Sequence, residues 1–290
     1  MIAQPAMSEA KTIGEALNWA AARLNEAGIE RPQAEARILL EAASGRGRGQ
    51  IIAFPEYTLT AEQQDMFHAL VSRRCAREPI SRILGNREFW SLRFAVGPAT
   101  LDPRPDSETL VAAVLARIPD RNARVAILDL GTGTGCLLLA LLSELTQAEG
   151  VGIDIDAAAR DTAAANATAL GLGARAEFRL GDWARDISAR FDVIVSNPPY
   201  IESLAIDGLA PEVAKHDPRG ALDGGPDGLS AYRALIPQAA QRLKSGGLIA
   251  LEIGAGQGPA VRALAIDAGL TDLGSAQDLA GIERCLLFTR

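Results

Sequence analysis

The chain has 290 residues, of which 48% are hydrophobic and 22% are charged, and this is the composition of a soluble globular protein with a sizeable core. No apolar run approaches the roughly 18 residues of a membrane-spanning helix, so we expect no membrane span. The net charge of −7 is uneven, because residues 1–100 carry 12 basic and 11 acidic side chains whereas residues 101–290 carry 17 and 25, which disfavours a nucleic acid as direct substrate.

Three amphipathic segments predict a small helical domain at the start of the chain. Apolar residues recur at helical spacing in Thr12–Ala27, Pro32–Ala43 and Thr60–Arg77. Threonine is a good N-cap for the first and third segments, and proline suits the first turn of the second. Between them, Gly45–Gly49 alternates glycine with arginine, which favours a solvated loop over a phosphate contact. We expect residues 1–82 to form an N-terminal helical domain.

A change of pattern follows the helical segments. Glu88–Trp90 and Leu92–Val96 predict two short strands around a turn near Ser91, and so a β-hairpin connector over residues 83–105. Asp106–Arg117 then predicts a helix that opens the largest domain, residues 106–290.

Strands and helices alternate from residue 123 onward. The expected strands are Val125–Leu130, Gly150–Ile155, Ala176–Leu180, Phe191–Val195, Gly247–Ile253, Thr271–Ala276 and Arg284–Phe288, and the expected helices are Cys136–Leu145, Ala157–Leu170, Ser230–Leu243 and Gly258–Ala268. This alternation predicts a Rossmann-like α/β domain with a mostly parallel seven-stranded sheet and helices on both faces. The last two strands have no helix between them and are expected to pair antiparallel.

A glycine-rich loop connects the first strand of this domain to its first helix. Its sequence is Gly131-Thr132-Gly133-Thr134-Gly135. Glycines let a backbone approach a ligand closely, and a dinucleotide-binding fold would share such a loop. Two features favour S-adenosylmethionine: the last glycine comes two residues after the previous one rather than three, and Asp129 precedes the loop. Its carboxylate either organises the loop or binds the methionine ammonium through water.

Two further positions at strand ends fit the same cofactor. Asp154 ends the second strand, where a carboxylate accepts hydrogen bonds from both ribose hydroxyls. Asp156 is its competitor, but it suits the N-cap of the next helix better. Trp183 follows the third strand, where it packs either on an adenine ring or simply in the core.

The tetrapeptide Asn197-Pro198-Pro199-Tyr200 follows the fourth strand. Prolines stiffen the backbone, so the side-chain oxygen of Asn197 and the carbonyl of Pro198 can each accept one hydrogen from a planar –NH2 group. Alone, Asn-Pro-Pro more often only ends a strand. Here four features fall at carboxyl ends of strands: the glycine loop, Asp154, Trp183 and Asn197. Open α/β sheets bind ligands at these ends, so the placement favours an active site.

The chain resembles the peptide chain release factor glutamine N5-methyltransferases (the PrmC/HemK family) over nearly its whole length. The matching segments are Arg77–Ile80, Ile83–Gly85, Glu88–Trp90, Pro103–Glu108, Asp129–Gly135, Asp154, Gly181–Trp183, Ser196–Ile201, Asp217–Pro218, Ala221–Leu222, Asp227–Gly228, Leu251–Gly254, Gln257 and Gly281–Arg284. Two positions depart from the family pattern: Arg82 replaces a frequent aromatic residue, and Ser107 replaces threonine but keeps the hydroxyl.

The resemblance implies a class I S-adenosylmethionine-dependent methyltransferase that methylates the glutamine of the Gly-Gly-Gln motif in class I release factors. It implies cofactor contacts at Gly131–Gly135, Asp154, Trp183 and Asn197, and substrate contacts at Asn197–Tyr200. Asn197, Pro198 and Tyr200 are the expected catalytic residues: the first two accept the N–H bonds of the amide and the third forms a wall beside it. S-adenosylhomocysteine is the expected product, and no metal is expected.

The same resemblance assigns residues 1–82 to the docking of a release factor. We expect a cytoplasmic protein, because Cys75, Cys136 and Cys285 are too widely spaced for a metal or redox pair and Met1–Ala10 lacks the pattern of a secretory signal. We also expect a monomer.

Three other functions stay open from the residues alone. They are methylation of an exocyclic base amine in DNA or RNA, methylation of a ribosomal-protein glutamine, and a non-catalytic binding role. Arg104, Glu108 and Glu252 either line the pocket or form structural ion pairs and caps.

Overall fold

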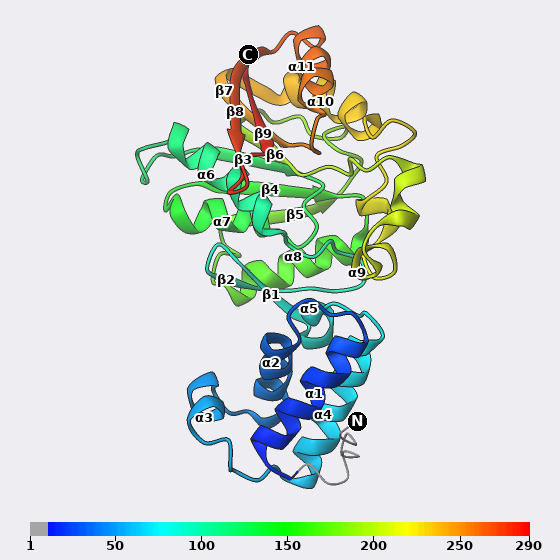
Figure 1. Ribbon diagram of the computed structural model, residues 1–290. Helices are drawn as coiled ribbons and strands as arrows, with labels where there is room; N and C mark the ends of the chain where they lie inside the picture. Colours follow the sequence, from blue (N-terminus) through cyan, green and yellow to red (C-terminus); the bar gives the residue numbers. More distant parts are fainter. Residues whose placement is uncertain (1–10) are drawn as a thin grey trace. The chain divides into compact units, whose positions relative to one another are not determined.

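The computed structural model describes residues 11–290 and divides into two units, the first ending at Gly85 and the second running from Asn86 to Arg290 (Figure 1). The expectation for Met1–Ala10 therefore falls outside the described residues. Among the described residues, no helix is long and apolar enough to cross a membrane.

The first unit is helical, as predicted. Its helices are α1 (Ile13–Glu26), α2 (Pro32–Ser44), α3 (Arg48–Ala53), α4 (Ala61–Cys75) and α5 (Ile80–Leu84). Thr12 and Thr60 both form capping boxes, in which the threonine side chain and the residue three positions on satisfy each other's backbone N–H groups. The break after α2 is shorter than predicted, because Arg48 and Gly49 already belong to α3. A core around Leu39, Phe67 and Val71 holds the helices together.

The second unit begins with the predicted β-hairpin. Its strands β1 (Asn86–Phe89) and β2 (Leu92–Ala95) pair antiparallel. Trp90 and Ser91 both have positive φ angles, 51° and 58°, which is the backbone geometry of a tight two-residue hairpin turn. The turn therefore starts one residue earlier than expected, and Trp90 lies in it rather than in the strand.

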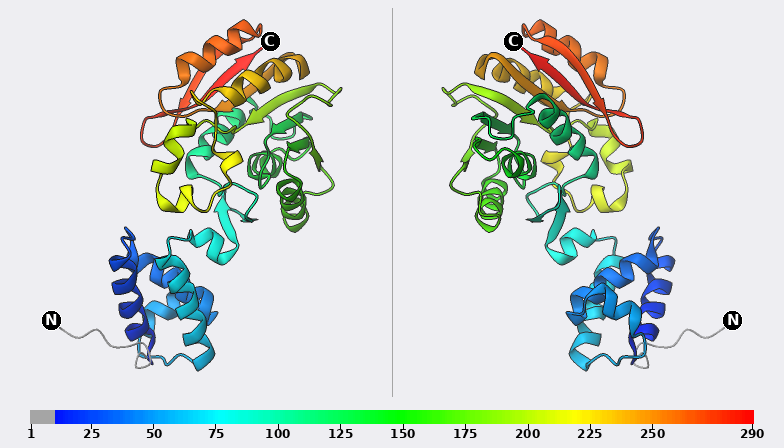
Figure 2. Two further views of the ribbon diagram at one scale, coloured as in Figure 1. Left: turned by 90° about the vertical axis from the view of Figure 1, so that its right-hand side faces the viewer. Right: turned by 90° about the vertical axis from the view of Figure 1, so that its left-hand side faces the viewer.

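The sheet of the second unit has seven strands in the order β5-β4-β3-β6-β7-β9-β8. Their bounds are β3 Ala126–Leu130, β4 Glu149–Asp154, β5 Ala176–Leu180, β6 Phe191–Ser196, β7 Leu243–Glu252, β8 Thr271–Gln277 and β9 Glu283–Thr289. The strands from β5 to β7 pair in parallel, while β9 pairs antiparallel with both β7 and β8. The mostly parallel sheet and the final antiparallel pair are therefore confirmed (Figure 2).

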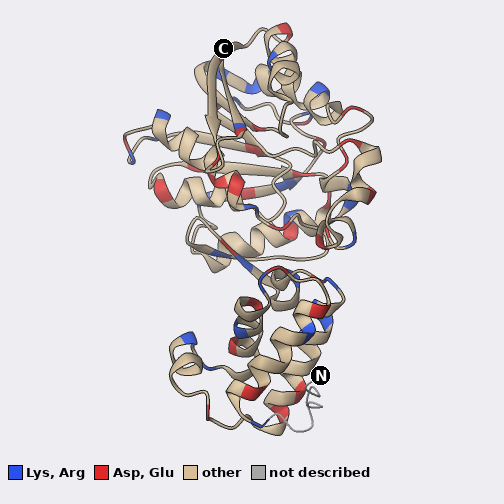
Figure 3. Cartoon of the chain, in the orientation of Figure 1, with Lys and Arg blue, Asp and Glu red and all other residues tan. Residues whose placement is uncertain are grey.

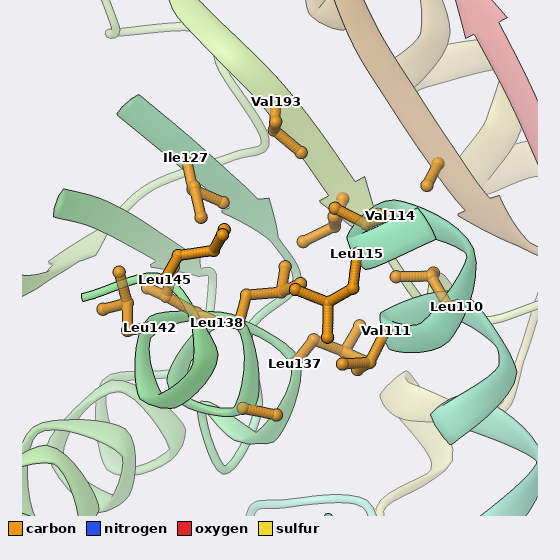
Figure 4. Packing of buried hydrophobic residues seen from close by; sticks show 14 of the residues in the cluster. Leu110, Val111, Val114, Leu115, Ile127, Leu137, Leu138, Leu142, Leu145 and Val193 are labelled. Carbon is orange, nitrogen blue, oxygen red and sulfur yellow. The ribbon is translucent and has the colours of Figure 1, made fainter. Parts of the chain in front are cut away.

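Helices cover the sheet with two separate apolar cores. The helices are α6 (Glu108–Arg117), α7 (Cys136–Glu144), α8 (Ala157–Ala169), α10 (Ser230–Arg242) and α11 (Gly258–Asp267). Side chains of α6 and α7, such as Val111 and Leu138, pack on Ile127 and Val193 in one core (Figure 4). Those of α10 and α11 pack on the other face of the strands in the second core. A parallel sheet needs such cover on both faces.

The segment between β6 and α10 was not predicted from the sequence. It contains two 3-10 turns, η3 (Ser203–Gly208) and η4 (Arg219–Ala221), and one short helix, α9 (Pro211–Ala214). Each is too short to produce a periodic apolar pattern. This segment matters because its last turn contributes to the site described next.

Candidate active site

A cavity of about 310 Å³ lies at the carboxyl ends of the parallel strands. Its lining includes the glycine loop after β3, Asp154 at the end of β4, Trp183 after β5 and Asn197 after β6. Arg104 and the segment around η4 complete the wall. The four strand-end placements expected from the sequence therefore meet in one cavity, and its size suits a small-molecule cofactor.

The glycine loop is shaped by its glycines and by a buried carboxylate. Gly131, Gly133 and Gly135 have φ angles of 74°, 56° and 79°, which only glycine adopts freely. Thr132 donates a hydrogen bond of 2.6 Å to Asp129, whose side chain is completely buried under the loop. Burial raises the pKa of Asp129 to about 7. Of the two roles expected for Asp129, the structure shows the organisation of the loop.

Asp154 links the glycine loop to the start of α8. Its two oxygens accept hydrogen bonds from the backbone N–H groups of Gly133, at 2.8 Å, and Asp156, at 2.9 Å. Burial raises the pKa of Asp154 above its ordinary value. Asp156 caps α8, as expected, by accepting from the N–H groups of Ala158 and Ala159. Asp154 is thus held rigidly at the cavity wall, with lone pairs left for a ligand.

Trp183 packs in the core, one of the two roles weighed for it, and it also reaches the cavity. Its φ angle of 54° is unusual for a residue with a side chain. The ring packs against the second core, and its edge lies 3.3 Å from the point where a Cβ atom on Gly131 would stand. It also lines the cavity. Trp183 therefore forms a flat apolar wall beside the glycine loop, the kind of surface on which an aromatic ring stacks.

The charge of the cavity distinguishes the cofactors that share a glycine loop. Among the described residues that line it, four carry carboxylates, Asp102, Asp154, Asp156 and Asp182, and one, Arg104, is cationic. An anionic pyrophosphate would be repelled by this set, whereas a sulfonium and an ammonium group would be attracted. The carboxylates therefore fit S-adenosylmethionine better than a dinucleotide.

The tetrapeptide divides between the cavity wall and the core behind it. Asn197 and Pro199 line the cavity, while Pro198 is buried and the Tyr200 side chain packs against the second core. The hydroxyl of Tyr200 donates to Glu252 at 3.4 Å. Asn197 donates from Nδ2 to the hydroxyl of Ser107 at 3.1 Å, and its Oδ1 makes no hydrogen bond within the described residues.

The three charged residues left open by the sequence have different positions. Arg104 lines the cavity and forms an ion pair of 2.5 Å with the buried carboxylate of Asp217. Glu108 accepts from the backbone N–H of Trp90 at 2.7 Å, so it fixes the hairpin turn. Glu252 lies behind the tetrapeptide and is only 2% exposed.

Sequence reasoning missed one residue that supports the glycine loop, Asn166 of α8. Its side chain donates to the carbonyls of Thr134, at 2.9 Å, and Ala95, at 3.1 Å, and accepts from the N–H of Ala95 at 2.8 Å. It therefore clamps β2 and the loop together from a buried position. An asparagine in the middle of an alanine-rich helix was the one sequence signal, because such a residue disfavours a helix interior unless it is used.

Comparison with known proteins gives two domain matches and a series of full-length relatives. The chain matches the PrmC N-terminal domain over residues 15–85 and the methyltransferase small domain over residues 106–216. It is 48% identical to the release factor glutamine methyltransferase of Rhodospirillum rubrum, over 99% of this chain and 88% of the relative. It is 46% identical to the same enzyme of Caulobacter vibrioides, over 93% of this chain and 94% of the relative.

Solved structures show the same fold at low sequence identity. The crystal structure of the hMettl16 catalytic domain, in complex with an RNA hairpin from the MAT2A 3′UTR, has a TM-score of 0.57 and 15% identity. The match covers 76% of this chain and 81% of that chain. This likeness establishes the methyltransferase fold, and the near-full-length relatives establish more: the chain belongs to the release factor glutamine methyltransferase family.

Proposed function

We propose that this protein transfers a methyl group from S-adenosylmethionine to the side-chain nitrogen (N5) of the glutamine in the Gly-Gly-Gln motif of class I release factors. The observation that carries the proposal is the state of Asn197. One hydrogen of its Nδ2 binds Ser107 at the cavity wall, and its Oδ1 accepts from none of the residues that the structure describes. A free acceptor beside an acidic, cofactor-sized cavity suits a methyl acceptor with a planar –NH2 group.

The residues of the tetrapeptide orient a weak nucleophile. An amide lone pair is delocalised into its carbonyl, so the site must place the nitrogen in line with the methyl group. Asn197 Oδ1 and the Pro198 carbonyl accept the two N–H bonds and favour the positive charge that develops on nitrogen. When bound, S-adenosylmethionine would supply an activated methyl group on its sulfonium. The N–CH3 bond would form as the S–CH3 bond breaks, which would leave S-adenosylhomocysteine, and the extra proton would pass from nitrogen to water.

A protein acceptor fits the charges of the second unit better than a nucleic acid does. Acidic and basic side chains are interspersed over its elements (Figure 3). Residues 101–290 carry an excess of acidic groups, 25 against 17 basic ones. Nucleic-acid enzymes instead gather basic side chains to neutralise phosphates. The three cysteines are free, as a reducing cytoplasm would keep them, and we propose a monomeric cytoplasmic enzyme without a metal.

The helical domain, residues 1–82, has a proposed role of its own, which is to dock the body of the release factor. The relatives that share this region are named after release factors, and the matched PrmC N-terminal domain spans residues 15–85. Docking would bring the Gly-Gly-Gln loop to the cavity and restrict the enzyme to a glutamine in this context.

Methyl transfer from labelled S-adenosylmethionine tests the proposed function directly. Incubation with a class I release factor, followed by peptide mass spectrometry, is expected to place the label on the glutamine of Gly-Gly-Gln. A factor with Gly-Gly-Glu in that position is the control and is expected to remain unlabelled. Label on an added RNA, DNA or ribosomal-protein substrate, with none on the release factor, would contradict the proposal.

Asp154 provides a quantitative test of the cofactor site. Asp154→Ala is expected to raise the dissociation constant of S-adenosylmethionine by about 10- to 100-fold. The ligand loses the carboxylate that binds its hydroxyl groups, and the backbone N–H groups of Gly133 and Asp156 lose the same acceptor. Asp120→Ala is the matched control: it removes an exposed carboxylate that accepts one backbone N–H, from Asn122 at 2.9 Å, but that lies outside the cavity lining, so the affinity is expected to stay nearly unchanged. Calorimetric titration and thermal unfolding measure both. Equal affinities of the two variants would disprove the assignment of Asp154.

A further inference from the structure

A buried set of polar groups lies directly behind Asn197. Asn197 Nδ2 donates to Ser107 Oγ at 3.1 Å, and Tyr200 donates to Glu252 Oε1 at 3.4 Å. Ser107 and Glu252 are each 2% exposed, so neither is exchanging its contacts with bulk water. The second carboxylate oxygen, Glu252 Oε2, is buried without a hydrogen-bond partner among the described residues. A carboxylate oxygen in this position needs a donor, because an unpaired buried charge is costly.

Ser107 is the donor available to Glu252. The structure forms no hydrogen bond between Ser107 and Glu252 Oε2, but the Ser107 hydroxyl is near enough to act on the carboxyl group and to lower its pKa. A serine hydroxyl has one proton and two acceptor lone pairs. Because Ser107 already accepts from Asn197, its single proton is free to point to Glu252. The order of donors then runs in one direction, from the Asn197 amide to the Ser107 hydroxyl to the Glu252 carboxylate.

This order determines which end of the Asn197 carboxamide faces the cavity. With Nδ2 committed to Ser107, Oδ1 is the atom presented to the methyl acceptor. The opposite orientation would present an –NH2 group to another –NH2 group and leave two donors facing each other. An ionised Glu252 opposes that orientation, because it retains the Ser107 proton that Asn197 Oδ1 would otherwise accept.

We propose that Ser107 and Glu252 are positioning residues that hold the Asn197 carboxamide in its acceptor orientation, and that the ionised form of Glu252 is the productive one. The inference rests on the proposed function and deepens it by assigning a protonation state to the site. When Glu252 is protonated it can itself donate to Ser107. The hydroxyl proton is then released and can bind Asn197 Oδ1, so the orientation is no longer enforced.

Burial, together with the charged and polar groups nearby, sets the pKa of Glu252. Burial, the largest effect, raises the pKa of Glu252 to about 7. Among the described residues, the ionisable and polar groups that act on it or are affected by it are Ser107, Arg284, Tyr200, Asp106, Tyr232, Cys136 and Cys285. Arg284 stabilises the carboxylate only in part, because it is also paired with Asp278 at 2.8 Å and Asp106 at 3.6 Å. If the ionised form of Glu252 is the productive one, its titration changes kcat near neutral pH.

The main experiment is a pH profile of kcat in the full-length enzyme at saturating cofactor. Because the ionised form is active, kcat of the wild-type enzyme is expected to fall about tenfold from pH 8 to pH 6, as for one group with a pKa of about 7. Saturation with cofactor is needed because Asp129, under the glycine loop, also has a pKa of about 7. Its titration would change the affinity for the cofactor, and saturation removes that effect from kcat. In Glu252→Gln, kcat at pH 8 is expected to fall about 10- to 100-fold, which is the cost of leaving a buried polar group unpaired. The step near pH 7 is expected to disappear in this variant.

The matched control is Glu108→Gln. It makes the same carboxylate-to-amide change next to Ser107, but on a side chain that accepts from Trp90 N–H, as a glutamine also can. Its pH profile is expected to match that of the wild-type enzyme. A step near pH 7 that persists in Glu252→Gln would overturn the proposal.

Ser107 tests the relay without removing the charge. Ser107→Ala is expected to lower kcat about 10- to 100-fold with little change in the KM for the release factor, because Asn197 loses its fixed orientation rather than its presence. Ser107→Thr restores the hydroxyl and is expected to recover most of the lost rate. A threonine variant as slow as the alanine variant would show that volume, not the hydroxyl, matters at this position.

A readout that needs no methyl acceptor separates this inference from the proposed function. The side-chain amide resonance of Asn197, identified by its loss in Asn197→Ala, is expected to shift with pH around 7 in cofactor-bound enzyme and to stay constant in Glu252→Gln. An enzyme with this titration but no activity on release factors would refute the proposed function alone. A flat resonance in an active enzyme would refute the positioning role alone.

Discussion

Asn197→Ala is expected to lower kcat for the methylation of an intact release factor by at least about 10²- to 10³-fold, the cost of removing one preorganised group from a charge-stabilising site. The side chain lines the cavity, and its Oδ1 is the acceptor that no described residue occupies. Alanine leaves one N–H of the acceptor amide unpaired and removes the alignment of its nitrogen with the methyl group. Single-turnover kinetics with saturating cofactor measures the loss.

The structural cost of Asn197→Ala is expected to be small, so a loss of activity can be assigned to chemistry. Among the described residues, Asn197 makes one side-chain hydrogen bond, to Ser107, so alanine removes a single contact. Asn122→Ala is a matched control, because Asn122 is an exposed asparagine in the loop before β3, where its Oδ1 accepts from Thr146. It is expected to keep full activity. Turnover of Asn197→Ala close to wild type, in a sample with the wild-type unfolding temperature, would rule out the mechanism.

The part of the site that could be predicted from the sequence is the part encoded by consecutive residues. The glycine loop, Asp154 and Asn197 each follow a recognisable apolar strand, and parallel strands bring their carboxyl ends together. Strand identity was sufficient to place these residues, without knowledge of any side-chain contact.

The contacts that support the site come from distant positions and could not be predicted in this way. Ser107 is 90 residues before Asn197, and Arg104 is 113 residues before Asp217. Neither pairing follows from periodicity or from a local motif. Each depends on how the segment before α6 packs against the loops after β6. The resemblance marked both segments but gave no reason for their side chains.

Short elements were missed for a different reason. The α3 and α9 helices have six and four residues, so they make fewer than two turns and present no repeating apolar face. The part of the cavity wall around η4, which has three residues, had no predicted structure for the same reason. The Gly45–Gly49 break was overestimated because glycine and arginine were read as a loop although arginine is also a good helix former.

Removal of residues 1–85, the whole first unit, is expected to separate catalysis from docking. Every residue that lines the cavity belongs to the second unit, which has its own two cores, so the dissociation constant for S-adenosylmethionine is expected to stay within about twofold of wild type. The kcat/KM for an intact release factor is expected to fall about 10²-fold or more, because a tethered contact that raises the effective concentration of the Gly-Gly-Gln loop is lost.

A short peptide that contains Gly-Gly-Gln provides the internal control for this truncation. The peptide cannot use a docking surface outside the cavity, so the full-length and truncated enzymes are expected to methylate it at equal, low rates. Equal loss on peptide and factor would instead indicate damage to the catalytic unit, which calorimetry with the cofactor would reveal. An unchanged kcat/KM on the intact factor would remove the docking role. The selectivity for glutamine in a release factor would then depend on the cavity wall, to which Arg104 and the η4 turn contribute.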